Sequence, residues 1–231
     1  MVGPFHWTPL EAFGLAFPEA TVAAEDLAVI TWILPQTENT KKDNRREDRL
    51  PAERWARSRI FGEAFNQQLR QSVAAELNRQ GYAAVAPFCL AQFHTEPSER
   101  FVIASTWSER HMVYAAGLGT FGLCDGLITP AGKAMRAGSV VAKITIEPAR
   151  RPYTDHHAYC LHYSKGTCGD CIARCPAGAM SRDGHDKIKC REFLNTKTRP
   201  YVKENFGFEG YGCGLCQTGV PCESGIPEEL R

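Results

Sequence analysis

The sequence predicts an α/β (α+β) domain followed by a small cysteine-rich module. Apolar, β-branched runs alternate with helical patterns over residues 20–148, which is typical of an α/β domain. Eight of the ten cysteines then fall between Cys160 and Cys222, where regular periodicity fades. A chain of 231 residues is long enough for one medium domain and one small one. We therefore expect an α/β domain over residues 1–150 and the small module over 151–231.

Local signals predict the elements of the α/β domain. Residues 27–34 (LAVITWIL) predict a buried strand, and the polar, charged segment 35–51 predicts a mobile surface loop. Residues 55–80 predict an amphipathic helix that ends at Gly81, with apolar side chains four residues apart at Phe61, Phe65, Leu69, Val73 and Leu77. Further strands are expected at 82–86, 101–104 and 139–146, and a helix at 108–116 that Gly117 ends.

Composition limits the compartment and the partners. The formal net charge is +1, so no overall field attracts nucleic acid or an anionic membrane, and we expect neither as a partner. The longest apolar stretch, 27–34, is too short to span a bilayer, and no secretory signal is evident. We expect a cytoplasmic protein, in which ten cysteines indicate metal-binding thiols instead of disulfides.

The cysteine run CGDCIARCP, residues 168–176, indicates an iron–sulfur module. It matches the end of the bacterial ferredoxin run C-x2-C-x2-C-x3-C-P. Counting back from Cys175, Cys171 and Cys168 take the expected places, and Cys160 is the nearest cysteine before them. Lys165 stands where the first ligand is expected, so the first gap is widened. Such a loop insertion costs little closure entropy.

The remaining cysteines complete a pattern of two clusters. In dicluster modules the cysteine that precedes proline binds the other cluster. The sequence thus predicts a ferredoxin-like module with two [4Fe–4S] clusters. The first quartet is Cys160, Cys168, Cys171 and Cys222, and the second quartet is Cys175, Cys190, Cys213 and Cys216. Cys160 and Cys222 both depart from the standard spacing, since Cys222 follows a proline instead of preceding one.

The sequence also allows two other sets of metal ligands. The C-x2-C pairs at 168/171 and 213/216 could form one tetrahedral zinc site, which would leave four cysteines without a role. Histidine can replace a cluster cysteine, so His162 is the spare ligand if Cys160 does not bind. His156 and His157 are expected at the surface or behind the ligands. Cys89 is expected to be a small buried hydrophobe, whereas a redox or ligand role for Cys124 stays open.

Two segments outside the run carry a resemblance to a known family. They are AAGLGTFGLCDGLITPAG at residues 115–132 and the later Tyr211-Gly212-Cys213-x2-Cys216. With the cysteine run they resemble the epoxyqueuosine reductase and reductive dehalogenase superfamily, strongly over 101–216. The chain is similar to a short member without the C-terminal helical repeats of epoxyqueuosine reductase. The resemblance implies cobalamin near one cluster, an electron donor such as ferredoxin or flavodoxin, and a small-molecule substrate.

The resemblance also shows where the chain departs from the family. It places Ile103 at the proton-donating aspartate of epoxyqueuosine reductase, and isoleucine cannot transfer a proton. We therefore expect a related reductase instead of epoxyqueuosine reductase proper. Tyr114 and Asp125 are candidate catalytic acids. Their alternatives are an aromatic on a helix face and an aspartate in a turn.

The glycines of the same segment are candidate cofactor-binding positions. Gly117, Gly119 and Gly122 would let a loop approach a flat cofactor closely. Glycine in a helix C-cap is the ordinary alternative. A dinucleotide fingerprint should follow a strand, whereas a predicted helix precedes this segment, which argues against NAD.

Three functional hypotheses follow. In the first, the chain is an iron–sulfur oxidoreductase that relays single electrons through two clusters to a site in the α/β domain. In the second, it is a non-enzymatic, ferredoxin-like electron carrier that docks redox partners. In the third, the clusters are structural. The arginines between residues 45 and 59 alternate with acidic residues, which indicates a solvated mixed-charge face instead of a binding surface.

Overall fold

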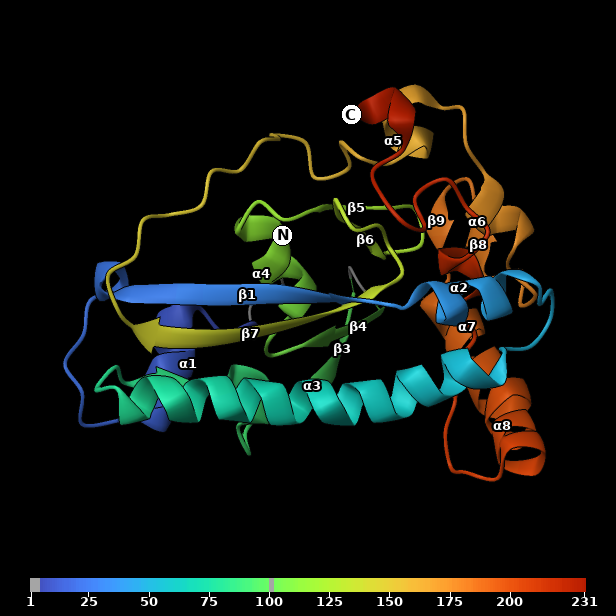
Figure 1. Ribbon diagram of the computed structural model, residues 1–231. Helices are drawn as coiled ribbons and strands as arrows, with labels where there is room; N and C mark the ends of the chain where they lie inside the picture. Colours follow the sequence, from blue (N-terminus) through green and yellow to red (C-terminus); the bar gives the residue numbers. More distant parts are fainter. Residues whose placement is uncertain (1–4, 100–101) are drawn as a thin grey trace. The chain divides into compact units, whose positions relative to one another are not determined.

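The computed structural model describes residues 5–99 and 102–231 (Figure 1). Contacts divide the chain into two compact units, each built from three segments. The first unit comprises Met1–Ile33, Phe65–Gly117 and Ala137–Arg151. The second unit comprises Leu34–Ala64, Leu118–Arg136 and Pro152–Arg231. The sequence predicted a linear division at residue 150, whereas two segments from the first part of the chain lie in the cysteine-bearing unit.

The first unit is built on a three-stranded sheet of order β1–β7–β2, from β1 (Leu27–Pro35), β7 (Met135–Lys143) and β2 (Ala84–Val85). β2 is antiparallel to β7, with Ala84 opposite Ala142. Successive strand side chains point to opposite faces. Val141 accordingly packs with Phe13 of α1 (Pro9–Ala16), while Val140 and Ala142 pack with Ala74 of α3 (Glu53–Arg79). The expected mixed α/β fold is thus observed, with a core on each face of the sheet.

The rest of the first unit is a hairpin and a short helix. β3 (Thr95–Ser98) and β4 (Val102–Ser105) are antiparallel, with Ile103 opposite Pro97. Short 3-10 helices cover Ala24–Asp26 and Pro87–Cys89. α4 (Glu109–Ala115) is followed by Gly117 with φ +82°. The predicted strands and helices are confirmed to within a few residues, except that Phe101 of the expected strand 101–104 lies outside the described residues.

The predicted apolar stripe of the long helix is only half correct. Val73 and Leu77 pack on the core with Ala74, but Phe61 and Phe65 are 51% and 57% exposed. Residues four apart advance about 40° around a helix at each step. A stripe of five such residues therefore turns through about 160°, and its first members leave the buried face. The ring of Phe61 lies 5.3 Å from that of Phe208.

The prediction of a mobile loop over residues 35–51 is wrong, because part of this segment forms α2 (Glu38–Arg45). Thr37 caps the helix by accepting the Thr40 backbone N–H. Buried polar side chains, and not an apolar stripe, attach it to the second unit. Lys41 Nζ donates to Ser224 Oγ at 2.6 Å, and Asn44 is completely buried. Hydrophobic periodicity cannot detect a helix that is held by polar contacts.

Short elements make up the rest of the second unit (Figure 1). They are β5 (Thr120–Phe121), β6 (Leu127–Ile128), α5 (Leu161–Lys165), α6 (Asp170–Ala173), β8 (Met180–Ser181), β9 (Gly184–His185), α7 (Lys187–Phe193), a π-helical turn (Leu194–Thr198), α8 (Arg199–Phe206) and 3-10 helices at Leu215–Gln217 and Glu228–Leu230. Across the described residues, no helix combines the length and apolar character that crossing a bilayer requires.

Candidate functional site

Six of the nine cysteines of the second unit gather around one apolar core. Cys124, Cys160 and Cys171 are buried with Leu123 and Ile128, and Cys175, Cys216 and Cys222 pack against them. The first quartet lines a single cavity. Its walls are Leu123, Ile128, Lys133, Cys160, Leu161, His162, Cys168, Cys171, Val220, Pro221, Cys222 and Pro227. The fold thus brings Cys222, distant in sequence, to the three cysteines with which the crossed ligand pattern pairs it.

The second quartet is close enough for its thiols to influence one another. Burial raises the pKa of Cys213 to about 11, and its neighbours Cys175 and Cys190 act in the same direction. The pKa of Cys216 is raised well above its ordinary value by a hydrogen bond with Cys124 and by burial, with Cys213 adding to the effect. The four predicted ligands of the second cluster therefore share one electrostatic environment.

The thiols of the first quartet include buried ones. Burial raises the pKa of Cys171 to about 12 and also raises that of Cys222. Bound metal cations hold such cysteines as thiolates and offset their mutual repulsion. Within residues 5–99 and 102–231, no three His, Cys, Asp or Glu side chains converge as a site for one metal ion. In a four-iron cluster each cysteine binds a different iron, so the sulfurs surround a cube and do not converge on one atom.

A hydrogen bond reaches one sulfur of the second quartet. The backbone N–H of Ala179 donates to Cys175 Sγ at 3.3 Å. Hydrogen bonds to ligand sulfurs help to set the reduction potential of iron–sulfur clusters.

The two cysteine pairs of the zinc alternative have different neighbours. The zinc alternative joins the pair Cys168 and Cys171 to the pair Cys213 and Cys216. The first pair instead lines a cavity with Cys160 and Cys222, and Cys213 has Cys175 and Cys190 as its electrostatic neighbours. Each C-x2-C pair therefore has its own set of partners.

Two further residues belong to this environment. Burial lowers the pKa of Lys133, but the thiols of Cys124, Cys222, Cys216 and Cys171 outweigh it and raise that pKa well above its ordinary value. A hydrogen bond with Cys216, together with the charge of Lys133, holds the pKa of Cys124 well below its ordinary value despite burial. Sequence reasoning missed Lys133, because lysines are mostly exposed and nothing near it in the sequence signals burial.

Sequence comparisons find similarity to known reductases. It is 33% identical over 125 residues to an epoxyqueuosine reductase of Bacillus anthracis, covering 52% of this chain and 30% of that one. It is also 33% identical over 128 residues to the epoxyqueuosine reductase of Staphylococcus aureus, covering 53% and 31%. The catabolic reductive dehalogenase NpRdhA shares the fold, with a TM-score of 0.57 and 17% identity over 88% of this chain and 27% of that one.

The chain is thus similar in sequence to epoxyqueuosine reductases over about half of its length, and it shares its fold with a reductive dehalogenase. No family model matches it. An epoxyqueuosine reductase from Streptococcus thermophilus shares the fold as well, with a TM-score of 0.50, 16% identity, and coverage of 99% of this chain and 57% of that one. The chain spans about 30% of the length of the curated relatives that it matches.

Gly117 and Gly119 of the glycine-rich segment lie close to backbone carbonyl groups of this chain. A Cβ at Gly117 would lie 2.7 Å from the Arg150 carbonyl oxygen, and one at Gly119 would lie 2.5 Å from that of Ile128. The Gly122 N–H donates to Gly126 O at 2.8 Å. Packing alone thus accounts for Gly117 and Gly119, and the cofactor-binding role of the three glycines stays a prediction.

The two candidate acids occupy different surroundings. Asp125 lies in the turn between β5 and β6 with φ +57°. Its Oδ2 accepts a hydrogen bond from His185 Nδ1 at 3.1 Å and lies 3.6 Å from Lys187 Nζ. That hydrogen bond and the one to Cys190 raise the pKa of His185 to about 10. Tyr114 is buried in the first unit, with the Arg151 guanidinium 5.4 Å from its ring centroid. Neither placement tests a catalytic role.

The histidines and Cys89 have structural partners. His162 Nδ1 lies 3.1 Å from Cys168 O, and its Nε2 lies 3.0 Å from Arg182 O. A ligand role for His162 would therefore break one of these contacts. His157 Nδ1 lies 2.8 Å from Phe121 O, and its ring lies against that of His156. Cys89 packs against the first unit's core as a small hydrophobe, but it is only partly buried and not buried as expected.

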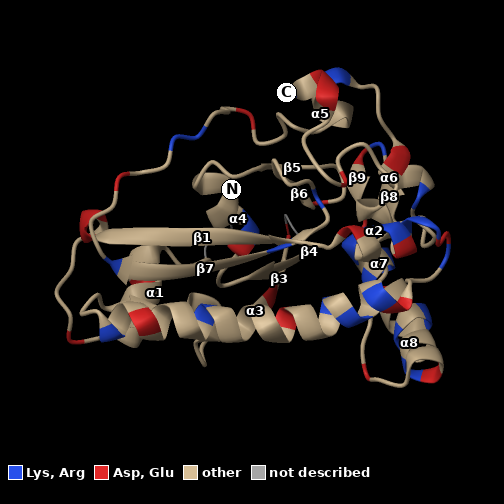
Figure 2. Cartoon of the chain, in the orientation of Figure 1, with Lys and Arg blue, Asp and Glu red and all other residues tan. Residues whose placement is uncertain are grey.

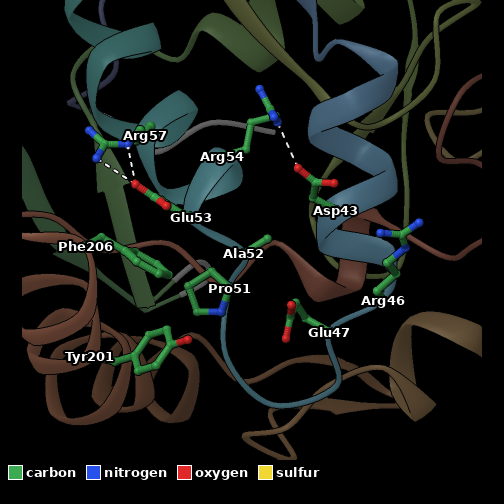
Figure 3. Close-up of a pocket in the computed structure, with 10 residues that line it drawn as sticks. All are labelled: Asp43, Arg46, Glu47, Pro51, Ala52, Glu53, Arg54, Arg57, Tyr201 and Phe206. Carbon is green, nitrogen blue, oxygen red and sulfur yellow. Dashed lines mark hydrogen bonds and ion pairs between the residues drawn. The ribbon is translucent and has the colours of Figure 1, made fainter.

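The second unit also has a surface pocket of about 490 Å³ (Figure 3). It is lined by Asp43, Arg46, Glu47, Pro51, Ala52, Glu53, Arg54, Arg57, Tyr201 and Phe206. Arg54 pairs with Asp43 at 2.8 Å and Arg57 pairs with Glu53 at 2.7 Å. Both charge signs occur along α2 and the start of α3 (Figure 2). The expected mixed-charge face is confirmed for these pairs, and none of the eight cysteines lines the pocket.

Proposed function

We propose that the chain is an iron–sulfur oxidoreductase that holds two [4Fe–4S] clusters and passes single electrons to a reducible substrate or cofactor. The observation that carries the proposal is the cavity lined by Cys160, Cys168, Cys171 and Cys222. Its four thiols come from both ends of the cysteine segment, as a dicluster module requires. Bound clusters would supply the one-electron chemistry.

The chain's own residues would create the surroundings for that chemistry. Ile128, Leu161 and Val220 give the cavity apolar walls, which keep water from the cluster ligands. The backbone N–H of Ala179 donates to Cys175 Sγ, and this bond would stabilise the ionised sulfur. The site therefore combines burial with hydrogen bonding, the two means by which a protein tunes a cluster.

Iron content tests the proposal directly. Anaerobic reconstitution with iron and sulfide should yield about eight irons per chain and a cluster signal in EPR after reduction. Cys171→Ser should remove the first cluster and Cys213→Ser the second, so each variant should hold about four irons. Cys89→Ser is the matched control and should keep all of them. Zinc in place of iron, or about four irons in the unaltered protein, would overturn the two-cluster assignment.

The proposal that the chain binds cobalamin rests on its relatives and not on a binding site described in this structure. One solved reductive dehalogenase is described as B12-dependent. Gly117 and Gly119 pack against the chain's own backbone, so they do not form a corrinoid site by themselves. Holo-protein should change the absorption spectrum of cob(II)alamin if it binds the cofactor. An unchanged spectrum at saturating protein would remove cobalamin from the proposal.

A ferredoxin-like electron carrier without catalysis is the second candidate. The alignment of Ile103 with the family's aspartate favours it, because isoleucine cannot donate a proton. The curated relatives are nevertheless named epoxyqueuosine reductase, so that activity is part of the test. A nucleic-acid substrate also stays open, since one solved epoxyqueuosine reductase holds a modified tRNA stem loop. Turnover of a tRNA stem loop carrying epoxyqueuosine, with reduced ferredoxin or flavodoxin as donor, would exclude the carrier alternative.

A further inference from the structure

Lys133 places a buried positive charge among the cysteines. Its side chain is 3% exposed and lines the cavity of the first quartet. Two backbone hydrogen bonds hold this stretch against the end of the cysteine segment, from Lys133 N to Cys222 O at 2.8 Å and from Ala134 N to Glu223 O at 3.2 Å. A Cβ at Gly126 would lie 2.9 Å from Lys133 Cδ, so the glycine leaves room for the lysine chain.

The charge of Lys133 acts on cysteines from both quartets. Cys171 and Cys222 belong to the first quartet, Cys216 belongs to the second, and all three interact electrostatically with Lys133. Lys133 also lines one cavity with Cys222, and Lys133 Cδ and Cys124 Sγ both lie within 3.3 Å of the position that a Cβ at Gly126 would take. A buried cation interacts strongly with nearby charge, because the protein interior screens it less than water does.

We propose that the fixed positive charge of Lys133 raises the reduction potentials of both clusters. The inference rests on the proposed function. Each cluster gains one negative charge when it accepts an electron from an external reductant. A fixed ammonium stabilises that reduced state more than the oxidised one. The potential of the first cluster should rise more, because Lys133 lines the cavity of the first quartet, which no cysteine of the second quartet lines.

Redox titration of charge variants tests this role. Reconstituted protein carrying Lys133→Met is titrated under argon and followed by EPR, with iron counted in every sample. We expect the reduced-to-oxidised ratio of the first cluster at a fixed potential to fall about tenfold, equivalent to a shift of about 59 mV for one electron. The second cluster should shift in the same direction but less. Lys133→Arg, which keeps the charge, should stay near the unaltered protein.

Lys203→Met is the matched control, because Lys203 is an exposed lysine of the same unit, paired with Glu209 at 2.6 Å. It should change the ratio less than about twofold, since water and salt screen an exposed charge. Lys133→Gln provides a second neutral variant. Full iron content with unchanged ratios in Lys133→Met overturns the inference, as does loss of iron in both neutral variants, which indicates a structural role. Absence of cluster iron in the unaltered protein overturns the proposed function itself.

Discussion

Asn44 Nδ2 donates a hydrogen bond of 3.3 Å to the carbonyl oxygen of Cys213. The same nitrogen donates to Thr218 Oγ1 at 3.1 Å, and Asn44 Oδ1 accepts the Ala52 N–H at 3.0 Å. Arg174 reinforces the contact by donating to Thr218 O at 2.9 Å and to Asn44 O at 3.2 Å. A polar helix thereby positions the loop that carries two predicted ligands of the second cluster.

Replacing Asn44 should loosen that loop. Asn44→Ala leaves several buried polar groups without partners and should lower the free energy of unfolding by about 3 kcal/mol. Chemical denaturation measures this loss, and iron analysis should show the second cluster affected first. Asn205→Ala is the control, because Asn205 bonds to Tyr201 O at an exposed site. Equal stability of the two variants would contradict the role given to Asn44.

Gly132 should tolerate no side chain. Its φ is +86°, and a Cβ there would overlap the Glu223 carbonyl oxygen. Gly132→Ala should therefore cost more than about 3 kcal/mol in thermal or chemical unfolding. Gly14 in α1 has open space around its Cβ position and no positive φ. Gly14→Ala should stabilise the protein by about 0.5–1 kcal/mol, and a similar gain at Gly132 would refute the predicted overlap.

The buried ion pair of Arg70 and Glu109 should be costly to break. Arg70 Nε lies 3.0 Å from Glu109 Oε1, with both side chains buried, and Arg70 Nη2 donates to Ala137 O at 3.0 Å. Arg70→Met removes the cationic partner of this carboxylate and should lower the free energy of unfolding by about 3–5 kcal/mol. Arg79→Met breaks the exposed pair with Glu76 and should leave unfolding unchanged within error. An equally small effect at Arg70 would disprove the prediction.

His6 should make the protein acid-sensitive. Burial lowers the pKa of His6. The Ser105 carbonyl oxygen, 3.3 Å from Nδ1, acts in the opposite direction but does not outweigh burial. In the described structure its buried Nε2 has no hydrogen-bond partner. The unfolded chain therefore binds a proton more readily, so the free energy of unfolding should fall as pH drops through about 6.5.

His6→Phe keeps a ring to stack on Trp107 and removes the titration. Melting temperatures measured from pH 7.5 to 5 should then decline less steeply than in the unaltered protein. His94→Gln is the control, because contacts with Gln92 and Glu96 raise the pKa of the exposed His94. That change should not flatten the acid side of the profile. An unchanged slope in His6→Phe would rule out His6 as the source.

Local sequence signals were sufficient to predict the strands and helices that have a regular apolar pattern. β1 and β7 are β-branched runs, and Gly81 and Gly117 each follow a helix with positive φ. The sequence could not reveal α2, since its buried face is made of Thr40, Lys41 and Asn44. The exposed Phe61 and Phe65 show the same limit, because a spacing of four drifts around the helix.

The sequence by itself predicted the resemblance to epoxyqueuosine reductases and the two sets of cysteines, because the spacing of ligands is a property of short runs such as Cys168 to Cys175. Only the tertiary structure decided that Cys222 lines a cavity with Cys160 and that Lys133 lies buried among the thiols. It also decided that Asp125 bonds to His185. These relationships join segments far apart in the chain, where long-range packing and buried charge, and not local periodicity, set which side chains meet.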